Sequence, residues 1–81
     1  MSRSELFSRV AAEIAVSLKC DPSLITPTTC AADIKNWDSL NNVKLLIHLE
    51  RRFRIRFAGL EASSLQNVGE LVDVIAAKLE D

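Results

Sequence analysis

Apolar residues recur at helical spacing over the first part of the chain, which predicts a helix over about residues 3–19. Ser2, followed three residues later by Glu5, has the form of a capping box at the start of this helix. The apolar positions that define its buried face are Leu6, Phe7, Val10, Ala11, Ile14 and Leu18.

The helical period disappears between residues 20 and 37. Pro22 and Pro27 restrict the backbone there, and Asp, Ser and Thr side chains offer local turn hydrogen bonds. A loop of this length in a small domain is usually functional or packed down by its own side chains. The side chains expected to anchor it are Leu24, Ile25, Ile34 and Trp37.

Two further helical segments follow this loop. A second helix is expected from about residue 39 to residue 52 or 53, and the segment after it has room for a short helix around residues 61–65. Asn67 with Glu70 then repeats the capping-box form and begins a last helix to about Leu79. The pattern predicts an all-α fold, a small four-helix bundle of three main helices plus one short helix.

The second predicted helix has two apolar faces when its residues are placed at about 100° per step. One face carries Leu45, Leu49 and Phe53, with Asn42 and Leu46 beside them. The roughly opposite face carries Leu40, Val43 and Ile47. A helix needs only one apolar stripe to join a small bundle, so the second stripe requires another explanation.

Positive charge decides how the second stripe is interpreted. Lys44, His48 and Arg51 lie beside Leu40 and Ile47, and burying them would cost far more than the apolar contacts return. We therefore expect the stripe to be at least partly exposed, with His48 a solvated helix residue. Exposed apolar residues rimmed by polar ones are typical of a protein-binding surface, so this helix is a candidate docking face.

Composition agrees with one small folded domain spanning residues 1–81. Of the 81 residues, 48% are hydrophobic and 26% charged, which is typical of a compact globule and leaves little room for a deep catalytic cleft. No apolar run approaches a membrane span, and "MSRSELFSRV" lacks the apolar region of a signal peptide, so we expect a cytoplasmic monomer. Cys20 and Cys30 fit no redox or zinc spacing and are expected to be reduced, partly buried thiols.

Ser39 stands in "NWDSLNNV", at the expected start of the second helix. Both Ser39 and Asp38 are residue types that cap helices, and Asp38 is the better candidate for the cap. A nucleophilic serine needs an adjacent base, and His48 would lie more than two turns away. Because first-turn N–H groups and the helix dipole favour an anion, the position suits a phosphate ester on Ser39.

The order of these elements resembles the acyl carrier proteins. "WDSLNNVKLLIHLERRFRIRF" looks like the family's D-S-L prosthetic-group motif and following helix, and "LQNVGELVDVI" is similar to its final helix. The upstream "DPSLITPTTCAADI" also looks like its long first loop. The resemblance covers nearly the whole chain.

This resemblance implies a non-enzymatic carrier in which Ser39 bears 4′-phosphopantetheine, attached by a phosphopantetheinyl transferase. The thiol of that arm would hold an acyl or aminoacyl group for activating ligases, acyltransferases or synthases. Asp38 and Leu40 are carried over as the neighbours that the modifying enzyme reads. The positions of the family's partner-recognition helix are occupied by Val43, Lys44 and Ile47, with Arg51 on the same face.

Two features depart from the family pattern. Asn36 stands where the family commonly has glycine, and asparagine tolerates a left-handed backbone better than most residues. The recognition helix is basic: residues 39–57 sum to +4, although the whole chain is −1. We therefore expect dedicated partners with a neutral, apolar or acidic docking patch.

Two other readings stay open on the sequence alone. "ERRFRIR" could be the phosphate-contacting patch of a small helical nucleic-acid-binding domain, although the sequence pI of about 5.8 is acidic. The chain could also be a helical interaction module that keeps the fold and is never modified. Neither metal-ligand spacing nor a glycine-rich phosphate loop is present in the sequence.

Overall fold

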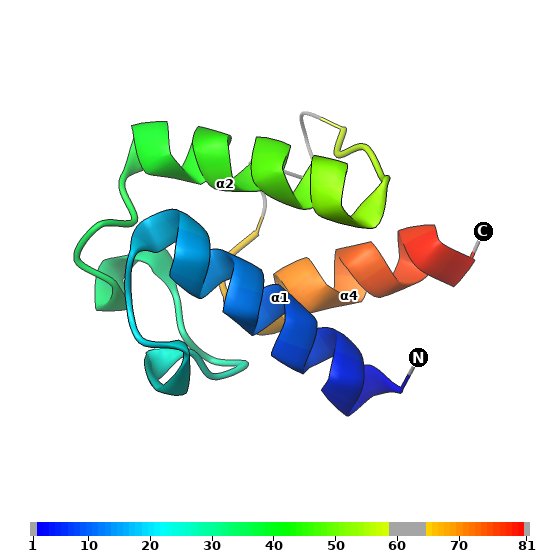
Figure 1. Ribbon diagram of the computed structural model, residues 1–81, viewed down its shortest axis with the longest axis horizontal. Helices are drawn as coiled ribbons and strands as arrows, with labels where there is room; N and C mark the ends of the chain where they lie inside the picture. The colour runs from blue at the N-terminus through cyan, green and yellow to red at the C-terminus, as the bar shows by residue number, and fades with distance from the viewer. Residues whose placement is uncertain (1, 59–64, 81) are drawn as a thin grey trace.

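The computed structural model describes residues 2–58 and 65–80, and this part of the chain is all-helical (Figure 1). Its elements are α1 (Arg3–Leu18), η1 (Pro22–Leu24), η2 (Ala31–Asp33), α2 (Ser39–Phe53) and α4 (Val68–Glu80). The three long helices confirm the prediction to within the usual uncertainty of helix ends. The short helix expected around residues 61–65 lies almost wholly outside the described residues.

α1 contacts both other long helices. Figure 1 shows the start of α1 and the end of α4 at one end of the molecule, and the first loop with the start of α2 at the opposite end. Ser39 is therefore presented far from both termini. None of the helices in the described ranges is long and apolar enough to cross a membrane.

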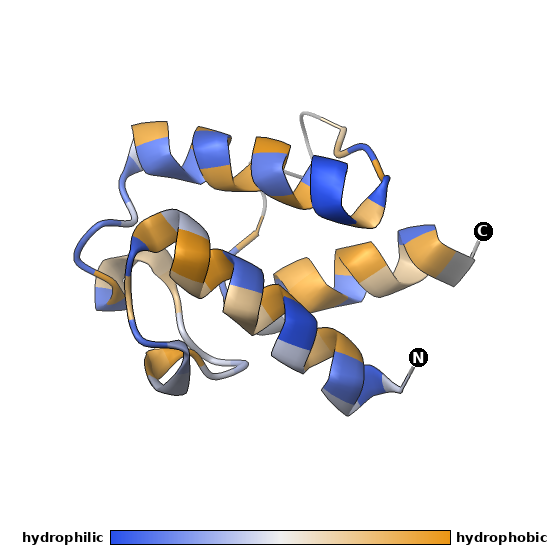
Figure 2. Cartoon of the chain, viewed as in Figure 1, coloured by the Kyte–Doolittle hydropathy of each residue, from blue (hydrophilic) through white to orange (hydrophobic). Residues whose placement is uncertain are grey.

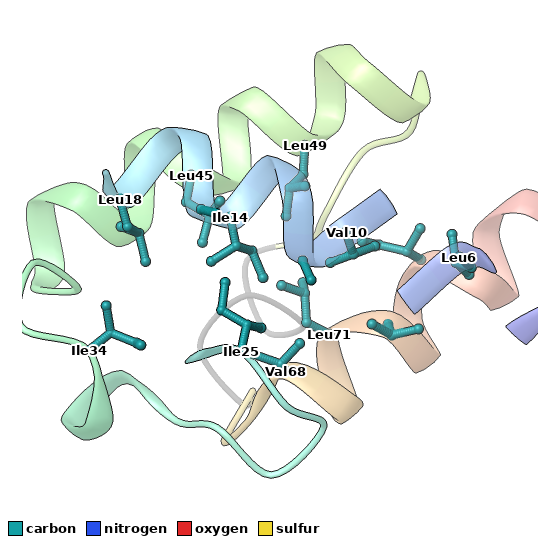
Figure 3. Close-up of a cluster of buried hydrophobic side chains, with 14 residues drawn as sticks. Leu6, Val10, Ile14, Leu18, Ile25, Ile34, Leu45, Leu49, Val68 and Leu71 are labelled. Carbon is teal, nitrogen blue, oxygen red and sulfur yellow. The ribbon is translucent and has the colours of Figure 1, made fainter. Parts of the chain in front are cut away.

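The core fills the space between α1, α2 and α4 (Figure 3). Ile14, Leu45, Leu49 and Ile75 are fully buried at its centre, and each comes from the apolar stripe of its helix. The first loop adds Ile25 and Ile34, as expected, and Trp37 packs against the core while half-buried.

Leu24 was wrongly predicted as an anchor of the loop, because its side chain is 60% exposed. It ends the 3₁₀ turn η1, which Asp21 caps by accepting a hydrogen bond from the Ser23 N–H at 2.9 Å. The turn exposes Leu24 and buries the next residue, Ile25.

The first loop is docked on the start of α4 by its backbone. The N–H of Val68 donates to the carbonyl of Thr29 at 2.9 Å, and the N–H of Gly69 donates to the carbonyl of Pro27 at 2.8 Å. Asn67 accepts from the N–H of Glu70 at 2.9 Å through its side chain. The loop therefore satisfies first-turn donors of α4 that a free helix end would leave to water.

Both α1 and α2 end in a left-handed residue that is not glycine. Lys19 has φ 57° and its N–H donates to the carbonyl of Ala15, and Arg54 has φ 56° and its N–H donates to the carbonyl of Glu50. Glycine is the usual residue at such a helix end because side chains strain this backbone conformation.

Candidate modification and docking site

The first turn of α2 is capped by Asp38, as predicted. Its Oδ1 accepts a hydrogen bond from the Asn41 N–H at 2.8 Å, and its carbonyl accepts from the Asn42 N–H at 2.8 Å. Ser39 is the first residue of the helix and is exposed. Because Asp38 supplies the cap, the Ser39 hydroxyl is left free for chemistry.

Side-chain hydrogen bonds fix the loop that leads into this turn. The amide of Asn36 donates to the carbonyl of Leu18 at 3.0 Å, and its own carbonyl accepts from the Asn41 amide at 2.7 Å. Asn36 does not adopt the left-handed backbone considered for it, since Lys19 and Arg54 are the residues with positive φ in the described chain. Its role is to tie the loop to α1 and α2.

A cavity of about 440 Å³ lies beside Ser39. At its rim, the indole N–H of Trp37 donates to Oδ1 of Asn42 at 2.8 Å. Its wall continues along α2 to Leu46 and across to the start of α4 at Leu71. A group attached to Ser39 therefore has both open solvent and a partly apolar hollow within reach.

The second apolar stripe of α2 is exposed, which confirms the expectation. Leu40, Val43 and Ile47 are 64%, 54% and 45% exposed, whereas Leu45 and Leu49 on the opposite face are fully buried. Figure 2 shows hydrophobic positions recurring along α2 until its strongly hydrophilic last turn. Lys44 and Arg51 are also exposed and lie on the same side as the stripe.

His48 was wrongly predicted to be a solvated residue. Its Nε2 lies 2.8 Å from Oε1 of Glu13 on α1, and Nε of Arg52 donates to Oε2 of the same carboxylate at 2.9 Å. Burial raises the pKa of Glu13, but hydrogen bonds from His48 and Arg52 outweigh burial and hold this pKa below its usual value. This three-residue cluster, Glu13 with His48 and Arg52, joins α1 to α2.

The two cysteines are free and half-buried, as predicted. Burial, assisted by the nearby negative charge of Asp21, raises the pKa of the Cys20 thiol, which makes it a poorer nucleophile at neutral pH. Sγ of Cys30 donates to Oδ2 of Asp33 at 3.3 Å. Within the described residues, no three His, Cys, Asp or Glu side chains form a group that could hold a metal ion.

Sequence reasoning did not find the Trp37–Asn42 hydrogen bond or the cluster around Glu13. The sequence nevertheless contains a signal that one residue of each contact requires a polar partner. Asn42 is a polar residue within the buried stripe of α2 and therefore needs a partner, and Glu13 adjoins the core position Ile14. His48 and Arg52 lie 35 and 39 residues from Glu13, so that cluster had to come from the fold, whereas Trp37 is only five residues from Asn42.

Together these features define the class of protein: a small helical domain that presents a serine at a capped helix start, beside an exposed apolar stripe. On α2 the ring of His48 lies nine residues from Ser39, about 13 Å along the axis, and it is engaged by Glu13. His48 is therefore too far from Ser39 to act as a base that activates its hydroxyl.

Known proteins identify the family. Comparison with models of known protein families finds no match. The chain is 34% identical over 79 residues to an acyl carrier protein of Thermosynechococcus vestitus, covering 98% of each chain. It is 32% identical over 78 residues to an acyl carrier protein of Thermotoga maritima, covering 96% of each.

A solved structure agrees with these relatives. The solution structure of a holo acyl carrier protein from Geobacter metallireducens matches with a TM-score of 0.84 and 34% identity, over 91% of this chain and 85% of that one. The chain belongs to the acyl carrier protein family. It is thus a carrier protein and not an enzyme.

Proposed function

We propose that Ser39 is the residue esterified by 4′-phosphopantetheine, transferred from coenzyme A by a phosphopantetheinyl transferase. The observation that carries this proposal is the division of labour at the start of α2, where Asp38 supplies the cap and Ser39 stays exposed. The N–H groups of Ser39 and Leu40 make no hydrogen bond within the described chain. They and the positive end of the helix dipole favour a phosphodiester at this serine.

The thiol of the attached group supplies the chemistry of the carrier by holding an acyl or aminoacyl group as a thioester. The chain's own residues attach and orient it. Asp38 fixes the first turn, Asn36 and Asn41 fix the loop before it, and the cavity beside Ser39 offers room for part of the arm or its cargo. A thioester on a tether gains a high effective concentration at any enzyme that the carrier contacts.

Partner enzymes dock on the exposed face of α2 in this proposal. The transferase recognises Asp38 and Leu40, the residues on either side of Ser39. Activating ligases and acyltransferases or synthases contact Val43, Lys44, Ile47 and Arg51. Support comes from the exposure of this apolar stripe on a helix that already buries Leu45 and Leu49 on its other face.

The test is to incubate the purified chain with coenzyme A and a broad-specificity phosphopantetheinyl transferase and then measure its mass. We expect the mass to rise by one phosphopantetheine group, and Ser39→Ala to abolish the gain. Ser8→Ala is the matched control, because Ser8 is an exposed serine on α1 and its loss should leave the gain intact. An unmodified wild-type chain would favour an interaction module that only keeps the fold.

A further inference from the structure

The positive charges of α2 fall into two groups that the sequence cannot distinguish. Arg52 is ion-paired with Glu13 at 2.9 Å on the flank that faces α1. Its sequence neighbour Arg51 is exposed and has no ion pair in the described chain, and the same holds for Lys44. At about 100° per residue, Lys44 and Arg51 lie within the same narrow face as Ile47, whereas Arg52 lies about a quarter turn away.

The free charge continues beyond the end of α2. Arg54 and Arg56 are exposed and have no ion pair in the described residues. Glu50, the one carboxylate in residues 39–57, accepts a hydrogen bond from the Phe57 N–H at 2.9 Å through Oε2. Arg51 therefore ends the exposed face with a free positive charge, and Arg54 and Arg56 add further positive charge just after the helix; these three arginines are called the positive patch below.

The apolar and positive parts of this face lie at different distances from the modified serine. Leu40 and Val43 stand in the first turn or so after Ser39. Arg51 lies twelve residues on, about 18 Å along the helix axis. Lys44, five residues after Ser39, adds one positive charge within the apolar part. A surface that complements α2 must therefore be largely apolar near the position of Ser39 and most negative about 18 Å away from it.

From this arrangement we propose that the enzymes served by this carrier bear an acidic patch about 18 Å from the entrance that receives the arm, with an apolar depression between the two. This inference rests on the proposed function and names the chemistry of its partner. An anionic membrane would also attract the positive patch. Three exposed apolar side chains on one side of the helix are a small area for membrane insertion, so an acidic protein surface is favoured.

The experiment captures a partner by cross-linking and then identifies the charged residues around the contact on its surface. A photoreactive amino acid at Val43 of the full chain cross-links partners in an extract of the producing organism, and the cross-linked peptide locates the contact on the captured enzyme. We expect carboxylates near that contact, on the side away from the active-site entrance. A surface rich in Lys and Arg, or no cross-link at all, would overturn the proposal.

Binding of the purified captured enzyme then tests the charge directly. Arg51→Gln should weaken binding roughly fivefold at about 50 mM salt and much less at about 500 mM, because exposed charges are screened. Arg52→Gln is the matched control, with the same charge change one position away, and should alter binding less than about twofold. Arg51→Glu should weaken binding further, and replacing one carboxylate of the enzyme's acidic patch by lysine should restore it if the two residues pair directly. Equal effects of Arg51→Gln and Arg52→Gln would refute the proposal.

Two further arms separate this proposal from its alternatives. Vesicles of phosphatidylglycerol and phosphatidylcholine should not bind the chain, and binding that Arg51→Gln abolishes would assign the positive patch to a membrane instead. The Ser39→Ala chain should still cross-link through Val43, because docking uses the helix face. If Ser39 proves unmodified while docking behaves as expected, only the carrier function fails.

Discussion

Replacing Gly69 by alanine tests whether the first loop is held to α4 by close backbone approach. A Cβ placed on Gly69 would lie 2.9 Å from the carbonyl oxygen of Pro27, a rigid backbone atom. That same oxygen accepts the hydrogen bond from the Gly69 N–H at 2.8 Å. The methyl group therefore cannot be accommodated unless the loop moves away from the helix.

The magnitude follows from two opposing effects. Alanine in place of glycine stabilises a helix by up to about 1 kcal/mol, and less in the first turn, where Gly69 lies. Moving the loop weakens the hydrogen bonds of Gly69 to Pro27 and of Val68 to Thr29, each worth about 0.5–1.5 kcal/mol net, so losing both would cost about 1–3 kcal/mol. The expected net destabilisation is about 1–2 kcal/mol.

Urea unfolding followed by circular dichroism measures this difference. Gly69→Ala should lower the free energy of unfolding by that amount, and the melting temperature by about 5–15 °C for a domain of this size. Ala77→Gly, at an exposed position later in α4, calibrates helix propensity alone and should cost about 1 kcal/mol. A Gly69→Ala chain as stable as the wild type would show that the close approach to Pro27 contributes nothing.

Two further predictions concern the helices that flank the site. Glu13→Gln should lower the free energy of unfolding by about 1–2 kcal/mol near neutral pH. Because the pKa of Glu13 is held below its ordinary value of 4.5, this stability difference should be fully present above pH 4.5 and should vanish as the pH falls through the lowered pKa. Paired urea titrations at neutral and acid pH measure it, and an equal difference at both would contradict an ionic role for Glu13. Lys19→Gly should raise the free energy of unfolding by about 0.5–1 kcal/mol, because glycine adopts the left-handed conformation without strain. Arg9→Gly, within α1, should lower the free energy of unfolding by about 1 kcal/mol. A Lys19→Gly chain less stable than the wild type would show that the left-handed backbone at Lys19 is not strained.

The parts of the fold that the sequence predicts are those governed by local periodicity. The bounds of α1, α2 and α4, the cap at Asp38 and the exposure of Leu40 and Ile47 all follow from spacing and residue type. Each depends on residues within one or two helical turns. The proposal that Ser39 is the modified residue rests on the same kind of information, because a capped helix start is a local feature.

The parts that the sequence does not predict depend on contacts between distant residues. His48 meets Glu13 from 35 residues away, and the loop at Pro27 meets Gly69 across the molecule. Leu24 and Ile25 are neighbours of similar hydrophobicity, and only the turn of η1 decides which is buried. No pattern along the chain carries that information, because the register of two elements is set by their packing.

The two-sided construction of α2 bears on how strongly a carrier can bind its partners. The hydrogen bonds of Asn41 hold its first turn, and the cluster around Glu13 holds its last turns against α1. A partner that docks on the outer face therefore meets a helix that is already ordered, and binding costs little backbone entropy.

The outer face itself is small. Three partly exposed apolar side chains and the free charges of Lys44 and Arg51 on the helix provide far less contact than a stable interface of about 1,600 Å² requires. Binding through this face should therefore be weak and quickly reversed, which suits a carrier that must leave one enzyme to reach the next. Selectivity must then come from charge, because a weak contact can still reject a partner of the wrong sign. On this reasoning Arg51 should affect the choice of partner more than it affects the stability of the fold, and Arg52 should do the reverse.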